Sequence, residues 1–383
     1  MLHALARFAG RFAPPQAKAS RALAAALYEA GHPAWTPRDY GALAREGFQR
    51  NGVAHRCVRL IAEAASGVPL LLFQGSDEIS EHPLLALLAR PNPRQAGLAL
   101  RETLFGHLLV AGNAYLEVVA VEGMPRELHA LRPDRMQVVP GRDGWPAAYD
   151  YGAGAERVRL PVPAEGLSPV LHLSLFHPTN DHYGLSPLEA AALALDIHNA
   201  ASAWNKALLD NAARPSGALV FGAQSLGDAQ FNRLKEELAQ SFQGAGNAGR
   251  PMLLDGGLDW KPLSLSPRDM DFVEAKNAAA RDIALAFGVP PLLPGLPGDA
   301  THANYAEANR AFYRQTVIPL LARTAESLAA WLGPAFGETL TLRPDPDAIE
   351  ALANERESLW RRVTAADFLT ADEKREAVGY GRR

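Results

Sequence analysis

The sequence predicts a protein of the α+β class, and three observations support this prediction. Apolar residues recur at helical spacing from Asp39 to Gly67 and again from Leu98 to Ala111. The period then changes to that of strands in short runs bounded by glycine and proline. These runs are Ala114 to Val121, Glu127 to Leu131 and Met136 to Val139. Finally, an alanine-rich run from Ser186 to Ala213 predicts one long helix, so helices dominate the second half.

The first 33 residues predict a flexible N-terminal arm. Met1 to Leu27 is rich in alanine and arginine and lacks acidic residues, a composition shared with transit peptides and membrane-surface helices. Its apolar residues are broken by Arg7, Arg11 and Pro14-Pro15, which leaves no segment of signal-peptide or membrane-spanning length. We therefore expect no membrane association.

Residues 34–185 predict one α+β domain. The helical pattern up to Gly67 leads directly into a short apolar strand, Val68 to Phe73. A helix from His82 to Ala89 follows, and the breaker Arg90-Pro91-Asn92-Pro93 separates it from the next one. The three strands listed above complete the domain.

The long helix over residues 186–213 has clear end signals. Ser186 is the expected N-cap, with Pro187 at the first helical position and Glu189 placed for a capping box. Arg214-Pro215 ends the helix. Residues 214–265 predict a compact insertion, with a strand at Gly217 to Phe221, an amphipathic helix at Ser225 to Gln243 and further strands. A second helix over residues 266–288 stops at Gly288.

The segment after Gly288 is dense in helix breakers. Residues 289–303 contain four prolines and three leucines and predict a loop. A long helix over residues 304–332 follows, and Pro319 in its middle predicts a kink, since proline removes one backbone hydrogen bond. Residues 333–383 predict one strand and two short charged helices.

Composition and motifs argue against an enzyme. The formal net charge of -4 disfavours a broad basic face for nucleic acid. The single cysteine, Cys57, excludes an intrachain disulfide and cysteine-rich zinc modules, and its helical context predicts a buried thiol. Gly244 to Gly249 matches the dinucleotide fingerprint, but a predicted helix precedes it and a strand follows, which reverses the order that phosphate binding requires. We therefore expect no cofactor, no metal and no catalytic residue.

Several segments, taken together and in order, resemble the HK97-type family of phage portal proteins, over roughly Trp35 to Leu332. The segments that carry the resemblance are Trp35-Thr36-Pro37, Val53 to Ala62, His82-Pro83-Leu84-Leu85, Arg90-Pro91-Asn92-Pro93, Gly112-Asn113-Ala114-Tyr115-Leu116, Leu131-Arg132-Pro133-Asp134-Arg135, Gly184-Leu185-Ser186-Pro187-Leu188, Asn247-Ala248-Gly249-Arg250 and Ala286-Phe287-Gly288-Val289-Pro290-Pro291.

The resemblance implies a portal fold. Residues 34–185 would be the wing, the helices over 186–213 and 266–288 the stem, and residues 214–265 a small α/β clip. Residues 289–303 would be the tunnel loop, 304–332 the kinked tunnel helix, and 333–383 a C-terminal wing segment with a short helical crown.

The resemblance also implies function and partners. The family forms rings, usually dodecameric, at one capsid vertex, where DNA is packaged and ejected. The expected partners are further copies of the chain, double-stranded DNA bound without sequence preference, the large terminase, the major capsid protein and a head-tail adaptor. The host would be a phage or a related particle such as a gene transfer agent, assembled in the bacterial cytoplasm.

Two sets of residues are expected to make the contacts. The DNA-facing set of the tunnel loop is Pro294, Gly295, Leu296, Pro297, Gly298, Asp299, Thr301 and His302. Within this loop only Asp299 and His302 can carry charge, and Pro294, Leu296 and Pro297 predict a stiff apolar rim that touches DNA by shape. In the clip, Arg214, Arg250 and Lys261 are the candidate partner contacts.

Two alternative functions remain open from sequence. His172, His177 and His182 recur at intervals of five, which could support a histidine-dependent metallohydrolase, although this step fits neither one helix face nor one strand face. A soluble adaptor protein unconnected with phage is the other alternative, and it would remain monomeric.

Overall fold

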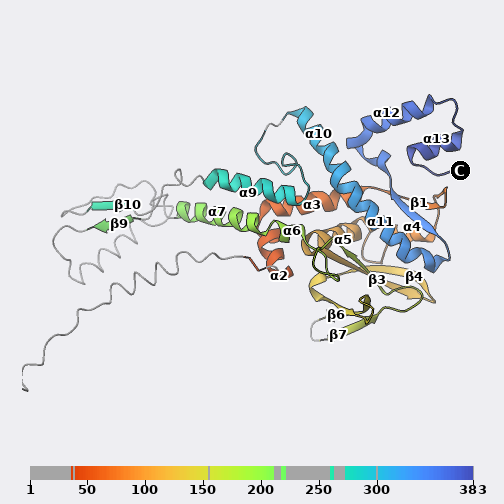
Figure 1. The fold of residues 1–383 in the computed structure, drawn as a ribbon, viewed down its shortest axis with the longest axis horizontal. Helices are drawn as coiled ribbons and strands as arrows, with labels where there is room; N and C mark the ends of the chain where they lie inside the picture. The colour runs from red at the N-terminus through yellow and green to blue at the C-terminus, as the bar shows by residue number, and fades with distance from the viewer. Residues whose placement is uncertain are drawn as a thin grey trace, which may run out of the picture. The chain divides into compact units, whose positions relative to one another are not determined.

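The computed structural model describes residues 36–37, 39–153, 156–210, 217–220, 259–262, 272–298 and 301–382. The chain divides into two compact units, Met1–Thr36 and Pro37–Arg383, and the elements below belong to the second. The arm predicted for residues 1–33 lies outside the described residues. Helices and small antiparallel sheets are mixed along the described chain, which confirms the α+β class (Figure 1). Within these residues, no helix is both long enough and apolar enough to cross a bilayer.

The N-terminal helical region is divided into three pieces where the sequence pattern predicts one run. They are α2 (Tyr40–Leu43), a π-helical turn η1 (Ala44–Gln49) and α3 (Gly52–Gly67). Asn51 separates the last two, because its side-chain oxygen accepts hydrogen bonds from the backbone of Val53 and Ala54, both at 3.1 Å. Cys57 on α3 is fully buried, and burial raises the pKa of its thiol to about 12, which confirms the predicted buried thiol.

Three small antiparallel sheets organise the predicted wing. Their strand orders are β4-β3-β8, β5-β6-β7 and β11-β1-β2, and the last recruits a strand from the C-terminal segment. The strands are β1 (Leu70–Gln74), β2 (Asp77–Ile79), β3 (Asn113–Val121), β4 (Met124–Leu131), β5 (Met136–Pro140), β6 (Pro146–Ala153), β7 (Glu156–Pro161), β8 (Val170–Ser174) and β11 (Leu340–Pro344). The intervening helices are α4 (Pro83–Ala89), α5 (Gly97–Ala111) and the 3-10 turn η2 (Pro133–Arg135). The sequence pattern located β1, β3, β4 and β5 and missed β2, β6, β7 and β8.

Two of the segments that carry the family resemblance meet where the wing leads into the first stem helix. The side-chain oxygen of Asn113 accepts a 2.8 Å hydrogen bond from the backbone of Gly184. The hydroxyl of Ser186 donates to the carbonyls of Leu109 and Val110 at the end of α5. Gly112, with φ 71°, lies so close that a Cβ on it would stand 2.3 Å from the carbonyl oxygen of Gly184. This junction, made of residues 109–113 and 184–186, therefore requires glycine for close backbone approach.

The first stem helix is not continuous, contrary to the prediction for residues 186–213. Ala191, with ψ 4°, separates α6 (Pro187–Ala190) from α7 (Ala192–Asp210), and nothing in an alanine-rich run signals this break. Ser186 is the N-cap as predicted, but the capping box is wrong. Its hydroxyl accepts from Leu188 and donates to α5, while the backbone N–H of Glu189 bonds the Ser186 carbonyl.

The second stem helix, α9 (Phe272–Ala286), packs against α7, and the two run in opposite directions (Figure 1). Gly288, with φ 65°, ends it as predicted. Between the stem helices the described residues form one antiparallel pair, β9 (Gly217–Val220) and β10 (Asp259–Pro262). The amphipathic helix predicted for Ser225 to Gln243 lies outside the described residues.

The predicted tunnel helix contains a π-helical turn just before its proline. It comprises α10 (His302–Phe312), η4 (Tyr313–Val317) and α11 (Ile318–Leu332). Pro319 has no N–H for the carbonyl four residues earlier, and the helix accommodates this in a wider turn. Phe312 and Val317, which stand five residues apart across this turn, are both buried in the same core.

The C-terminal segment is fastened to the wing. It consists of the 3-10 turns η5 (Gly333–Phe336), η6 (Pro346–Ala348) and η7 (Glu350–Leu352) together with β11, α12 (Ala353–Thr364) and α13 (Ala371–Val378). After α13 the chain returns to the β1–β2 hairpin, where the backbone of Arg382 donates to Ser76 and accepts from Glu78. Arg375 donates to Gly381 and to the carboxylate of Glu78 and holds this return in place.

Candidate DNA-facing site

The tunnel loop leaves α9 through a tight helix end. The backbone N–H groups of Gly288 and Val289 donate to the carbonyls of Leu285 and Ala284, both at 2.9 Å. These bonds satisfy carbonyls that would otherwise end the helix unpaired. The direction in which the loop starts is thus set by α9 itself.

The first half of the loop is anchored in the core. Val289 and Leu293 are buried in the cluster that also contains Phe287 and Val317, and Leu296 packs half-buried against it. Successive turns shape the backbone, with N–H groups donating from Leu293 to Pro290, from Gly295 to Leu292 and from Leu296 to Pro291. These residues therefore have a fixed position before any partner arrives.

Two further bonds clamp the loop to the neighbouring helices. The Thr316 hydroxyl, on the π-helical turn, donates to the carbonyl of Gly288 at 2.6 Å. The guanidinium of Arg281, on α9, donates to the carbonyl of Pro297 at 2.9 Å. Neither bond could be predicted from local sequence, because each joins a loop carbonyl to a side chain outside the loop.

The predicted DNA-facing residues fall into two groups, those that are exposed and those that pack against the core. Gly295, Pro297, Gly298 and Thr301 are exposed, whereas Pro294 and Leu296 are half-buried. The expected rim of Pro294, Leu296 and Pro297 is thus wrong in part, because Leu296 turns to the core. Thr301 caps α10 by accepting from the backbone of Asn304 at 3.2 Å. Asp299 and the side chain of His302 lie outside the described residues.

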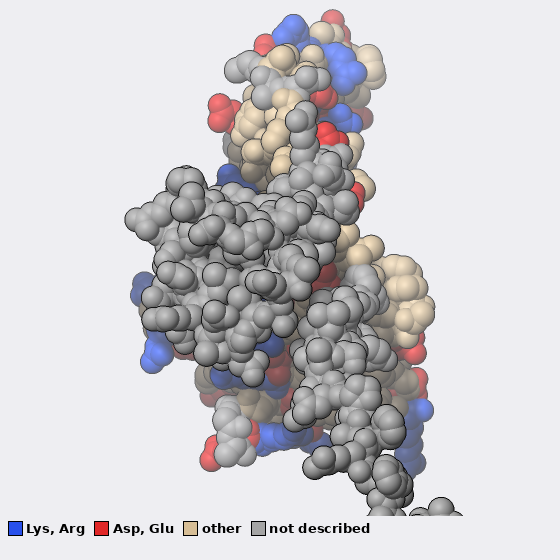
Figure 2. Space-filling view, turned by 90° about the vertical axis from the view of Figure 1, so that its left-hand side faces the viewer, with Lys and Arg blue, Asp and Glu red and all other residues tan. Residues whose placement is uncertain are grey.

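Charge at this site is sparse and comes partly from outside the loop. Loop residues 289–298 contain no ionisable side chain, and exposed Arg281 brings a cation to Pro297 from α9. On the face drawn in Figure 2, the visible basic and acidic side chains are interspersed. Loop residues 289–298 themselves therefore provide little attraction for a polyanion.

Of the three candidate clip residues, the structure describes only the backbone of Lys261. Lys261 lies on β10 opposite Ala218 of β9, and its side chain lies outside the described residues. Arg214 and Arg250 also lie outside them. Their role as partner contacts stays a prediction.

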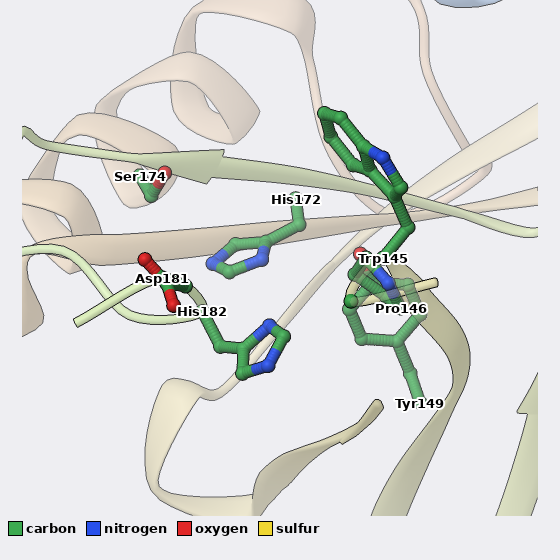
Figure 3. A pocket seen from close by; sticks show the side chains of 8 residues that line it. Trp145, Pro146, Tyr149, His172, Ser174, Asp181 and His182 are labelled. Atoms are coloured by element: carbon green, nitrogen blue, oxygen red, sulfur yellow. The ribbon is translucent and has the colours of Figure 1, made fainter. Parts of the chain in front are cut away.

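The three regularly spaced histidines do not come together. His172 and His182 line one pocket with Trp145, Tyr149 and Asp181 (Figure 3). His177 is not among the residues that line it; it is half-buried and accepts a hydrogen bond from the backbone of Thr179. His172 donates its Nε2 proton to Asn113 at 3.0 Å and stacks on Tyr115. In the part of the chain that the structure describes, no group of three potential ligands could hold a metal ion. The geometry gives the metallohydrolase alternative no support.

Comparison with known proteins identifies relatives over most of the chain. The family model described as phage portal protein matches residues 53–379. A solved structure, the neck of a native gene transfer agent particle computed with C12 symmetry, contains a chain that is 55% identical. That match covers 94% of this chain and 99% of the other, with a TM-score of 0.69.

Curated relatives extend the comparison. An uncharacterized protein of Rickettsia bellii is 43% identical over 339 residues, 87% of this chain and 88% of its own length. The portal protein of Enterobacteria phage HK97 is 25% identical over 290 residues, 73% of this chain and 66% of its own. These matches span both the wing and the segments assigned above to stem and tunnel.

Proposed function

Because the chain belongs to the phage portal protein family, we propose that it forms the ring at one capsid vertex of a gene transfer agent or related phage-like particle. The observation that carries this proposal is the 55% identity, over 94% of the chain, to a component of a gene transfer agent neck. The C12 symmetry of that neck supports a ring of twelve copies. In this role the protein is a structural conduit for DNA and not an enzyme.

The partners follow from this position. The ring would pass double-stranded DNA, dock the large terminase during packaging, contact the major capsid protein and later hold the head-tail adaptor. The most direct test is negative-stain microscopy of the purified chain. Holed rings of identical subunits are expected, and lone protomers at high concentration, with none built into particles, would refute the proposal.

We further assign DNA contact to the exposed tip of the tunnel loop, residues 295–298. Duplex DNA carries one charge per roughly 1.7 Å, so a few ion pairs from each subunit would hold it tightly. The tip instead offers Gly295, Pro297 and Gly298 without an ionisable group, which supports contact by shape. DNA could then slide past.

A test of this contact has to leave the buried first half of the loop, residues 289–293, intact. Removing Leu293 to Gly298 would also remove a buried core residue, so loss of rings after that deletion would not separate the two roles. The double variant Pro297→Lys, Gly298→Lys keeps Leu293 and adds a ring of cations, with Pro297→Ser, Gly298→Ser as the matched neutral control.

The lysine variant should assemble normally and should release DNA from particles more slowly at low salt than at high salt. The serine variant should release DNA as the unmodified chain does. Equal release by both variants at every salt concentration would show that the tip does not touch DNA.

A further inference from the structure

The outward side of α7 carries an apolar stripe that no described residue of the chain covers. Leu193 is 57% exposed and Ile197 is 42% exposed. Ala200 follows at the same helical spacing and is also exposed. Buried Leu195 lies on the opposite side of the helix. A surface helix normally presents polar residues on the side that faces water, so this stripe indicates a protein contact.

The outward side of α9 has a second, different stripe. Leu285 is 76% exposed, and Ala278, seven residues earlier, is exposed on the same side. Ile283, about 160° away around the helix, is buried on the opposite side. Here Arg281 and Asp282 accompany the apolar residues, whereas the stripe on α7 is free of charge from Leu193 to Ala200 apart from half-buried Asp196.

The two stripes lie on different helices of one packed pair. Helices α7 and α9 pack together, and buried residues of both belong to one core cluster. The pair of helices therefore offers two different exposed flanks, the α7 flank with Leu193 and Ile197 and the α9 flank with Leu285. A closed ring with rotational symmetry needs this arrangement, since each subunit must offer one patch to the preceding copy and a different patch to the next.

We propose that the α7 flank of one subunit binds the α9 flank of the next copy of this chain, with Leu193 and Ile197 meeting Leu285 of the neighbour. The proposal rests on the ring inferred above and names its contact. The two helices are antiparallel, so the beginning of α7 lies beside the end of α9 (Figure 1). Rotation about the ring axis leaves height along that axis unchanged. Residues at the same end of the helix pair are therefore the ones that meet.

Cysteine cross-linking tests the contact directly. The only native cysteine, Cys57, is buried and should react little. The double variant Leu193→Cys, Leu285→Cys, treated with a short bis-maleimide, should give a ladder of covalent oligomers on a denaturing gel. Each single cysteine variant should give no ladder, because copies of one residue are separated around the ring. The pair Val121→Cys, Leu285→Cys, which joins a wing residue to α9, should give none either.

A charge variant gives an independent measure. Leu193→Asp, Ile197→Asp should raise the protein concentration needed for assembly at least tenfold, since burying an unpaired carboxylate is strongly unfavourable. Val121→Asp, a similarly exposed aliphatic position at 54% exposure, should assemble as the unmodified chain does. The melting temperature of the unassembled subunit should be unchanged in both variants, which separates assembly from folding.

The results distinguish this inference from the proposed function. If the unmodified chain forms no ring, the function itself fails. If rings form but the cysteine pair gives no ladder and the aspartate variant assembles at the usual concentration, only the proposed contact is overturned.

Discussion

The hydroxyl of Thr316 reaches back 28 residues to donate a 2.6 Å hydrogen bond to the carbonyl of Gly288. It joins the π-helical turn of the tunnel helix to the point where the tunnel loop leaves α9. The loop and the helix are thus held together at one backbone carbonyl.

Replacing Thr316 by valine keeps the shape of the side chain and removes the bond. We expect the free energy of unfolding to fall by about 1 kcal/mol. Hydrogen exchange at residues 289–293 should rise because the start of the loop loses its clamp. Ser327→Ala is the control, since Ser327 makes a bond of similar length within α11. Equal exchange in the two variants would show that the clamp does not order the loop.

Gly112→Ala should disrupt the junction between wing and stem. A Cβ there would lie 2.3 Å from the Gly184 carbonyl oxygen, and φ 71° is itself unfavourable for alanine. We expect a loss of about 3 kcal/mol or failure to fold, measured by chemical denaturation. Gly106→Ala on α5 meets nothing within 4 Å and should stabilise the chain by up to about 1 kcal/mol. Similar effects of the two changes would contradict the close approach.

His172 should make stability depend on pH. Burial, with a smaller contribution from His182, lowers the pKa of His172 from 6.5 to about 4. The unfolded chain binds this proton more readily, so stability present above about pH 6.5 is lost as the pH falls towards 4. The loss should be on the order of 2 to 3 kcal/mol. His172→Asn should be less stable at pH 7, and its deficit should shrink as the solution is acidified. A deficit that stays the same from pH 7 to pH 4 would contradict this prediction.

Arg375 should hold the C-terminal return against the wing. It bonds both the Gly381 carbonyl and the Glu78 carboxylate, at 2.7 and 2.9 Å. Arg375→Met should cost about 1 to 3 kcal/mol of local stability and speed removal of the last residues by a carboxypeptidase. Arg361→Met breaks only an exposed pair within α12 and should leave trimming unchanged. Unaltered trimming of the Arg375 variant would show that other contacts suffice.

The sequence predicted those elements whose burial repeats with a clear period. Helix α5 and strands β3 to β5 were located because apolar residues mark their buried sides. Strand β7 was missed because Glu156 to Arg159 are all exposed, so no alternation distinguishes it from a loop. Strand β8 was missed because it has His172 at its centre. The ring of His172 is accommodated by Asn113 and Tyr115 of β3, which pairs with β8 but lies far from it in the sequence.

The candidate site was predicted in position more than in detail. Proline and glycine located the tunnel loop, since they act through local backbone preferences. Burial of Leu293 and Leu296 depends on packing against Val317 and other residues that are distant in the sequence. The local sequence pattern does not indicate this packing. The bond from Arg281 to Pro297 also joins residues far apart in the sequence, so the local pattern could not predict it. The break at Ala191 also escaped prediction, because alanine favours continuing a helix.

The π-helical turn from Tyr313 to Val317 contains one residue more than a turn of regular α-helix. The tunnel helix should therefore tolerate the loss of exposed Arg314 or Gln315. With either removed, Phe312 and the valine after it would stand four apart in a regular helix and still share one side. We therefore expect that homologues can differ in length by one residue at this turn while the buried residues of the core keep their positions.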